Sequence, residues 1–289
     1  MKEKRICIFG GSGFLGHALI ERLALVGRRN IVIVGRNEGA LVATKARFPF
    51  VEVIPGDIAD PWVVRKAMSR AWEVYHLAAM KHVGLAETEV RACITSNVIG
   101  TSNIMEASLE FIPEVLVFIS TDKAAQPSGV YGCSKKIGEQ LVAEAQRINP
   151  ETRYRVLRYG NVWGSTGSIA TKWRPLIERG EEVTLTDPDA SRFFWTVTEA
   201  VDLIFQAVNT TIGGCDPIVP KMKAVKMGVV LEACIEHFMQ SSGNGRARSE
   251  VNIIGLQPGE NKTETTDGVI FSDQVEQFTK AEFIKKFLS

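Results

Sequence analysis

A tyrosine and a lysine stand four residues apart, Tyr131 and Lys135, at the start of a segment with helical periodicity. Side chains at this spacing lie on one face of a helix. A phenol ordinarily ionises at about pH 10, and a nearby ammonium group lowers its pKa towards neutral pH. The pair can therefore take a proton from an alcohol. Tyrosine and lysine at this spacing also occur on solvated helix faces, so the pair alone is a weak signal.

A second polar group directly follows the apolar run 115–119. Thr121 could donate a hydrogen bond to a substrate oxygen, and Asp122 and Lys123 add an acid and a base. Oxidation of an alcohol needs only the tyrosine, its lysine and a hydroxyl donor, so the two added groups indicate further proton transfers. A polar loop with a solvated ion pair is the alternative on spacing alone.

A glycine-rich turn follows the first apolar run of the chain. Its glycines recur every three residues, after a predicted strand and at the start of a predicted helix. In that setting glycines allow a tight turn, let the backbone approach a pyrophosphate and let helix pack on strand, while free N–H groups at the helix start bind phosphate. A turn without a ligand is the alternative. The predicted cofactor contacts here are Gly10, Ser12, Gly13, Phe14, Leu15 and Gly16.

Residues after the second and third predicted strands bear on the choice of cofactor. Arg36 comes about twenty residues beyond the last glycine of the turn, where an NAD-binding protein usually carries an acidic residue. An arginine suits the 2′-phosphate of NADP, so we expect NADP. NAD is the alternative, with Arg36 on the surface and Glu38 holding the ribose. Asp57 and Ile58 are placed to contact the cofactor near its adenine, although Asp57 could instead cap a helix at Pro61.

The order of the predicted elements places these residues in one fold. Up to about residue 160, apolar runs alternate with helical segments, which is typical of an α/β doubly wound parallel sheet that binds a dinucleotide. We expect a dinucleotide-binding domain over 1–165, to which 192–212 return, and a smaller substrate-binding cap over 166–191 and 213–289. The predicted strands are 5–9, 31–34, 51–55, 73–77, 115–119 and 154–158, and the predicted helices 14–25, 61–71, 86–110, 131–146 and 272–287.

Composition excludes several classes of function. The 289 residues, 45% of them hydrophobic, can bury a core without disulfides or metal. A formal net charge of +1 gives no basic field for nucleic acid or an anionic membrane. The five cysteines form no CxxC pair, the four histidines lack metal-ligand spacing, and no apolar run suits a signal peptide or a membrane span. We therefore expect a cytoplasmic protein with reduced thiols and no metal.

Several segments together resemble one family, the inverting UDP-N-acetylglucosamine 4,6-dehydratases, which are also 5-epimerases and belong to the extended short-chain dehydrogenases. The resemblance spans most of the chain, and its most specific part is the active-site stretch 120–127 followed by 130–132. The other similar segments are the loop 78–83, the stretch 158–165 that meets the sugar nucleotide, and the later signatures at 191–194 and 219–221.

The resemblance implies a mechanism. Tyr131, supported by Lys135, would remove the proton of the sugar 4-hydroxyl while hydride leaves C4 for the nicotinamide, with Thr121 orienting the 4-oxygen. Lys123 would take the C5 proton and Asp122 would protonate the departing 6-hydroxyl, so that water is lost. Hydride would then return to C6, and protonation of C5 from the opposite face would give a 5-inverted 6-deoxy-4-keto sugar.

The resemblance also implies contacts outside this centre, and it has departures. Arg192 is a candidate because the fork of an arginine matches a diphosphate, and its alternative is a surface cation. Asn161 is a second candidate, and its alternative is an amide that caps a loop. Gln257 stands where the family usually has arginine, so the nucleotide or sugar could differ. The implied cofactor contacts are Ala78, Ala79 and Lys81, and the implied substrate contacts are Lys81, Asn161, Arg192, Lys221 and Glu260.

Two other functions stay open on the sequence. A nucleotide-sugar 4-epimerase or 4-reductase of the same fold would leave Asp122 and Lys123 incidental. A non-catalytic NADP-binding scaffold would have no need of Thr121, Tyr131 and Lys135 together. For either enzyme the resemblance implies a homo-oligomer, with a nucleotide sugar as the small-molecule partner.

Overall fold

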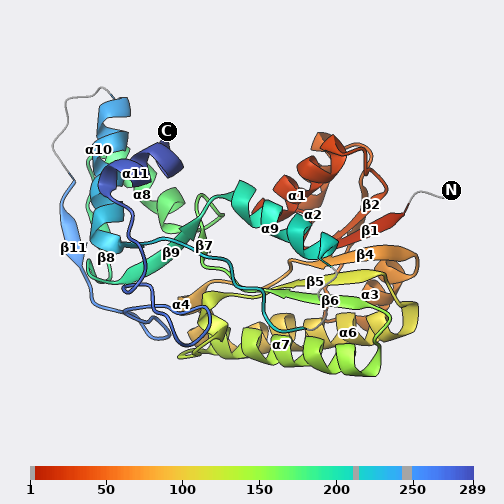
Figure 1. Ribbon diagram of the computed structural model, residues 1–289. Coiled ribbons are helices and arrows are strands. Elements are labelled where there is room, and N and C mark those ends of the chain that lie inside the picture. The colour runs from red at the N-terminus through yellow and green to blue at the C-terminus, as the bar shows by residue number, and fades with distance from the viewer. Residues whose placement is uncertain (1–3, 211–214, 243–248) are drawn as a thin grey trace.

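The computed structural model describes residues 4–210, 215–242 and 249–289. At its centre is a six-stranded parallel sheet in the order β3-β2-β1-β4-β5-β6 (Figure 1). The strand order reverses between β1 and β4, which is the doubly wound arrangement of dinucleotide-binding folds. The predicted α/β sheet is therefore confirmed. Its strands are β1 (Arg5–Phe9), β2 (Ile31–Gly35), β3 (Glu52–Pro55), β4 (Ala71–His76), β5 (Val115–Ile119) and β6 (Arg153–Leu157).

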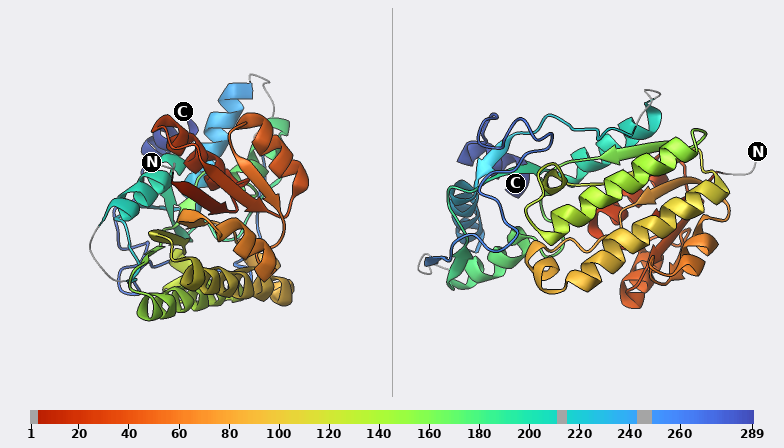
Figure 2. Two further views of the ribbon diagram at one scale, coloured as in Figure 1. Left: turned by 90° about the vertical axis from the view of Figure 1, so that its right-hand side faces the viewer. Right: turned by 90° about the horizontal axis from the view of Figure 1, so that it is seen from below.

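Helices cover both faces of this sheet (Figures 1 and 2). Figure 2 shows α6 and α7 side by side on the lower face. One face carries α1 (Phe14–Leu25), α2 (Glu38–Arg47) and α9 (Val197–Asn209), and the other carries α3 (Pro61–Met68), α6 (Gly100–Phe111) and α7 (Val130–Ile148).

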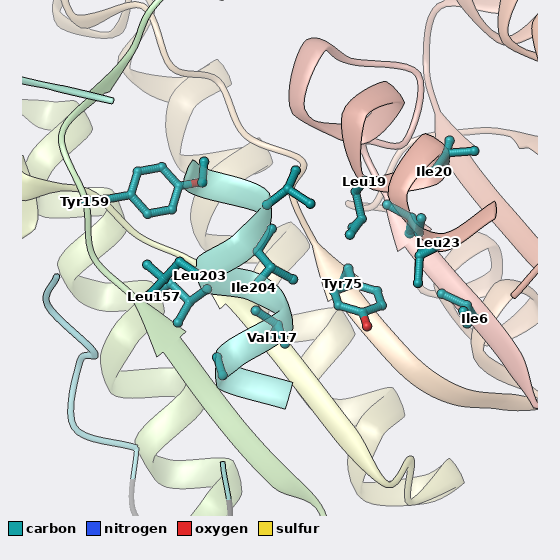
Figure 3. Packing of buried hydrophobic residues seen from close by; sticks show 14 of the residues in the cluster. Ile6, Leu19, Ile20, Leu23, Tyr75, Val117, Leu157, Tyr159, Leu203 and Ile204 are labelled. Carbon is teal, nitrogen blue, oxygen red and sulfur yellow. The ribbon is translucent and has the colours of Figure 1, made fainter. Parts of the chain in front are cut away.

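Two hydrophobic cores form because successive strand residues point to opposite faces. In β1, Ile6 and Ile8 pack towards α1 and α9, whereas Cys7 and Phe9 pack towards α3 and α6. Figure 3 shows the first core, where helix side chains of α1 and α9 meet those of the strands. Burial on both faces accounts for the continuous apolar runs that made these strands predictable.

A smaller layer lies beside the sheet, on the left in Figure 1. It has a three-stranded sheet in the order β10-β9-β7, a two-stranded sheet of β8 and β11, and its own hydrophobic core. The elements are β7 (Asn161–Val162), α8 (Ile169–Arg179), β8 (Val183–Leu185), β9 (Ser191–Trp195), β10 (Ala224–Lys226), α10 (Met227–Ser242), β11 (Val251–Ile253) and α11 (Lys280–Phe283).

The segment 192–212, which we expected to return to the first domain, is divided. Helix α9 begins after Thr196, whose side chain forms a reciprocal capping box with Glu199, and its Leu203 and Ile204 enter the core of the large sheet. Strand β9 instead pairs with β7 and β10 in the smaller layer. Residues 211 and 212 lie outside the described residues.

One helix of the structure was not predicted, and two predicted helices differ from the structure. Helix α2 was not predicted, and it starts where the Asn37 side chain accepts a hydrogen bond from Ala40 N. The predicted helix 86–110 is four pieces: α4 (Val83–Thr88), α5 (Val90–Ile94), a π-helical turn over Thr95–Ile99, and α6. The predicted helix 272–287 is wrong over its first half, because α11 begins only at Lys280 and is followed by a π turn over Ile284–Leu288. Within the described ranges, none of the helices combines the length and apolar character needed to cross a membrane.

Candidate active site

The glycine turn after β1 is shaped for close approach of backbone. Gly10 has φ +81°, and a Cβ placed on it would lie 2.7 Å from the backbone nitrogen of Ala78 in the loop after β4. A Cβ on Gly16 would lie 2.4 Å from the carbonyl oxygen of Gly11. Gly13 precedes α1 and gives it no side-chain cap, so the first N–H groups of α1 are left for a ligand. The turn therefore fits a pyrophosphate.

Arg36 and Asp57 lie together at the carboxyl ends of β2 and β3. Their side chains are 3.4 Å apart, and that of Arg36 is largely exposed, so the arginine is available to a ligand. Asp57 accepts a hydrogen bond from Ala59 N, whereas the cap of α3 is Asp60, which accepts from Trp62 N. Asp57 is thus not the helix cap that was its alternative reading.

Other predicted cofactor contacts are divided between core and surface. Ile58 is buried, and its side chain belongs to the core between the sheet and the α3–α6 face. Leu15 packs at the edge of the opposite core. Lys81 is exposed in the loop after β4, while Ser12 and Phe14 are half-buried in the glycine turn. Ile58 could therefore offer a cofactor only its backbone.

An asparagine that sequence reasoning missed clamps the loop after β4. The Asn97 side chain accepts from Met80 N at 2.8 Å and donates to Met80 O at 2.9 Å. Its amide also donates to Ser134 Oγ, three residues after Tyr131, at 2.9 Å. Asn97 lies in the π turn, a feature often found at functional sites. It thereby fixes the loop with Ala78 and Ala79 against α7.

Tyr131 and Lys135 both lie in the first turns of α7, as predicted. The helix is held at its start by Glu87, whose carboxylate accepts from Val130 N at 2.6 Å. Burial raises the pKa of Tyr131 to about 12, and the nearby Lys123 and a hydrogen bond with Thr121 oppose that rise. In this structure Lys123 is therefore a cation that favours the phenolate, a role that the sequence indicated for Lys135.

Lys135 has a different environment. Its side chain is 4% exposed and its Nζ lies 4.1 Å from the ring centre of Phe118. Burial lowers the pKa of Lys135 to about 7, because a charged amine loses hydration there. Burial therefore favours the neutral amine far more than in an exposed lysine.

The Thr121–Lys123 segment ends β5 and forms a buried acid–base pair. One oxygen of Asp122, Oδ1, accepts from Thr121 Oγ1 at 2.8 Å and from Lys123 Nζ at 3.1 Å. Its other oxygen, Oδ2, is buried and has no hydrogen-bond partner among the described residues. The pair is thus not the solvated surface ion pair that was its alternative reading.

A second carboxylate, from the C-terminal segment, completes this cluster. Glu264 is 2% exposed, and its Oε1 lies 3.3 Å from Lys123 Nζ in an ion pair without hydrogen-bond geometry. Arg192 Nε lies 3.8 Å from the same oxygen. Burial alone would lower the pKa of Lys123, but Asp122 and Glu264 raise it above its ordinary value. Burial raises the pKa of Glu264, which Lys123 and Arg192 oppose.

The C-terminal segment that carries Glu264 is fastened on both sides. Glu264 N donates to Ser272 Oγ, and Ser272 N donates back to Glu264 O. Arg158, in the first part of the chain, donates to Thr266 O at 2.7 Å while its Nη2 pairs with Glu139 at 2.6 Å. Sequence reasoning missed Glu264 because no local pattern marks a residue brought to the site from so far along the chain.

The predicted substrate contacts differ in place. Arg192 is buried beside Glu264 and donates to Ser191 O and Lys262 O, so it is no surface cation. Asn161 donates to Phe193 O at 3.1 Å, which is the loop-fastening role of its alternative reading. Glu260 accepts from Gln257 N within its own turn, and Lys221 is exposed. The structure therefore brings only Arg192 of this group into the acid–base cluster.

The arrangement combines two capacities. A turn that fits a pyrophosphate lies at the carboxyl end of β1, next to the reversal of strand order where doubly wound sheets bind ligands. A tyrosine, a threonine, an acid and a lysine meet at the ends of β5 and the start of α7. Fold and site together define a protein of the extended short-chain dehydrogenase/reductase class.

Within that class, the chain belongs to the family described as polysaccharide biosynthesis protein, whose model matches residues 6–285. It is 34% identical over 90% of its length to the uncharacterized membrane protein MJ1061 of Methanocaldococcus jannaschii, of which it covers 79%. It is 32% identical to an inverting UDP-N-acetylglucosamine 4,6-dehydratase of Campylobacter jejuni, with 89% of this chain and 75% of the relative covered. It is 31% identical to a UDP-glucose 4-epimerase of Rickettsia rickettsii, with 91% and 77% covered.

Similarity in structure agrees with this placement. The solved structure of Pen from Bacillus thuringiensis superposes with a TM-score of 0.85 at 29% identity, covering 91% of this chain and 80% of that one. Two longer relatives, CapD of Staphylococcus aureus and EpsC of Bacillus subtilis, are matched over only 44% of their length. The chain is thus a member of a nucleotide-sugar dehydratase and epimerase family, as the resemblance predicted.

Proposed function

We propose that this protein is an NADP-dependent nucleotide-sugar 4,6-dehydratase that inverts C5, with UDP-N-acetylglucosamine as its substrate. The observation that carries the proposal is the buried Asp122–Lys123 pair beside Thr121 and Tyr131. A C4 oxidation needs no such pair, whereas loss of water needs one group to take the C5 proton and one to protonate the leaving hydroxyl. The cytoplasmic location and homo-oligomeric assembly expected from the sequence belong to the same proposal.

The cofactor is supported by the fit of the chain to it. The glycine turn would hold the pyrophosphate, and the accessible Arg36 would hold the 2′-phosphate of NADP. When bound, the nicotinamide would supply a reversible acceptor for hydride, so that no cofactor would be consumed. NAD remains the alternative if Arg36 makes no such contact.

The protein's own groups account for the proton transfers that lead to the loss of water. Tyr131 takes the proton of the sugar 4-hydroxyl, with Thr121 holding the 4-oxygen. The resting ion pair holds one proton between Lys123 and Asp122, and moving it across their 3.1 Å hydrogen bond turns Asp122 into an acid and Lys123 into a free base. Lys123 then takes the C5 proton, and Asp122 gives its proton to the departing 6-hydroxyl, which leaves as water. The unpartnered Asp122 Oδ2 is the oxygen free to face that hydroxyl.

A 4-epimerase is the second candidate, favoured by the likeness to the Rickettsia relative of that name. It would use Tyr131 and Thr121 in the same way as the dehydratase, but hydride would return to C4 instead of C6. The Asp122–Lys123 pair would then have no proton to move.

The test is to incubate the protein, UDP-N-acetylglucosamine and NADP in deuterium oxide and to follow the sugar by proton NMR. A new C6 methyl signal without coupling to a C5 proton is expected, because C5 carries deuterium. Inversion at C5 should change the ring conformation and therefore the H1–H2 and H2–H3 couplings. Lys123→Ala should abolish water loss and keep C4 oxidation, visible as reduced nicotinamide. Inversion at C4 alone would establish the epimerase, and failure of a panel of nucleotide sugars to bind in calorimetry would leave the scaffold reading.

A further inference from the structure

Glu264 is a buried carboxylate at the acid–base centre for which the proposed proton transfers have no use. It comes from the C-terminal segment, more than a hundred residues along the chain from Lys123, with which it forms an ion pair. Its carboxylate is held between two cations, Lys123 at 3.3 Å and Arg192 at 3.8 Å. Burying a charge is costly unless it is paired, so this pairing needs an explanation in the chemistry or in the packing.

The charges around Lys123 show when Glu264 matters. The groups that face the Lys123 ammonium are Asp122 from its own segment, Glu264 from the C-terminal segment, Arg192 from β9 and Tyr131 from α7. At rest Asp122 and Glu264 balance Lys123 and Arg192. Once Asp122 carries the proton destined for the leaving hydroxyl, Glu264 is the one carboxylate of this set that remains charged beside Lys123.

We propose that Glu264 is a positioning residue that keeps Lys123 basic while it takes the C5 proton. The proposal rests on the proposed function for its catalytic meaning. Glu264 exchanges no proton with the sugar; it stabilises the positive charge that appears on Lys123 Nζ as the C5–H bond breaks. A catalytic triad uses a buried carboxylate behind its base in the same way. Substrate therefore need not approach Glu264.

The geometry favours a fixed role over an incidental contact. The backbone of Glu264 is bound in both directions to Ser272, and Ser272 Oγ is bound to Ser191 O in β9. Two residues further on, Thr266 O is held by Arg158. A side chain on so restrained a backbone has few other positions, so its carboxylate stays near Lys123 during the reaction.

The activity test uses Glu264→Gln, which keeps the size of the side chain and removes its charge. In deuterium oxide with UDP-N-acetylglucosamine and NADP, we expect C5 deuteration and water loss to slow at least about tenfold, the equivalent of one pKa unit of base strength. Formation of reduced nicotinamide should stay within about twofold of wild type. Glu276→Gln is the matched control, because Glu276 lies in the same segment but is 72% exposed. Equal slowing of C4 oxidation and C5 deuteration, or no slowing, would overturn the proposal.

A second measurement decides the matter even if the proposed function fails. Only the neutral amine reacts in reductive methylation, so the labelling rate of Lys123, read by mass spectrometry at fixed pH, reports its pKa. Glu264→Gln should raise that rate about tenfold or more, and Glu264→Asp, which keeps the charge, should restore slow labelling. If Glu264→Asp labels as fast as Glu264→Gln, loosened packing is the cause and the proposal is wrong. An unchanged rate in Glu264→Gln refutes it as well, whatever reaction the wild type catalyses.

Discussion

Replacing Lys135 by methionine should stabilise the cofactor-free protein at neutral pH, although it removes a residue of the candidate active site. The Lys135 side chain is 4% exposed and burial lowers its pKa to about 7. In the unfolded chain the amine is fully hydrated, with the ordinary lysine pKa. Folding at pH 7 therefore costs free energy, because it either buries the charge or expels the proton.

The size of this cost follows from the two pKa values. The folded pKa of about 7 lies about 3.5 below the ordinary value of 10.5, and a pKa difference of one is worth about 1.36 kcal/mol. The penalty is thus about 5 kcal/mol below pH 7 and is lifted as pH rises towards the unfolded pKa. Between pH 7 and pH 9 the Lys135 term alone should add about 2 kcal/mol to the free energy of unfolding.

The assay is urea unfolding of wild type and Lys135→Met without cofactor at several values between pH 7 and pH 9. We expect the variant to be more stable at pH 7 and its advantage to shrink by about 2 kcal/mol at pH 9. Lys136→Met is the control, because the neighbouring Lys136 side chain is 43% exposed and should show no such slope. A Lys135→Met advantage that does not change with pH would refute the reasoning that burial controls this amine.

Three further outcomes are expected. Gly10→Ala should abolish dinucleotide binding in calorimetry. Gly27→Ala, at φ +79° with open space around its Cβ, should cost only about 1 kcal/mol of stability and keep binding. Equal losses of binding in the two variants would contradict a role of the glycine turn in binding. Arg158→Met should lower the free energy of unfolding by about 3–5 kcal/mol, because it leaves Glu139 buried without its cation. A loss under about 1 kcal/mol would show that water takes the place of the arginine beside Glu139. Arg36→Ala should weaken NADP binding about tenfold and leave NAD unchanged, and equal effects on both would remove Arg36 from the 2′-phosphate.

The large sheet was predictable because its signal is local. Strands buried on both faces read as apolar runs, and the glycine turn carries its own spacing. Helix α2 was not predicted, because only Leu41 and Thr44 of its residues are buried and its sequence therefore shows little helical periodicity. The predicted helix 86–110 was continuous in pattern but is broken at Glu89, where the backbone leaves helical geometry before α5.

The candidate site was predictable in its local part and not in its distant one. Thr121, Asp122 and Lys123 are consecutive, and Tyr131 and Lys135 share a helix face, so spacing alone groups them. Which lysine acts on Tyr131 depends on packing around Phe118 and on the direction of the Lys123 side chain, which spacing does not encode. The sequence likewise does not show that Arg192 is buried and joins the cluster, whereas Lys221 is exposed.

The fastening of the C-terminal segment has a consequence for the order in which the protein is made. A ribosome completes the glycine turn, β5 and the Tyr131 helix more than a hundred residues before it reaches Glu264. Arg158 and its partner Glu139 are synthesised early, whereas the carbonyl of Thr266, which accepts a hydrogen bond from Arg158, is synthesised late. A nascent or truncated chain ending before residue 264 thus contains the residues of the glycine turn and of α7 but lacks the second carboxylate beside Lys123. The acid–base centre can therefore be completed only after the C-terminal segment with Glu264 has been synthesised.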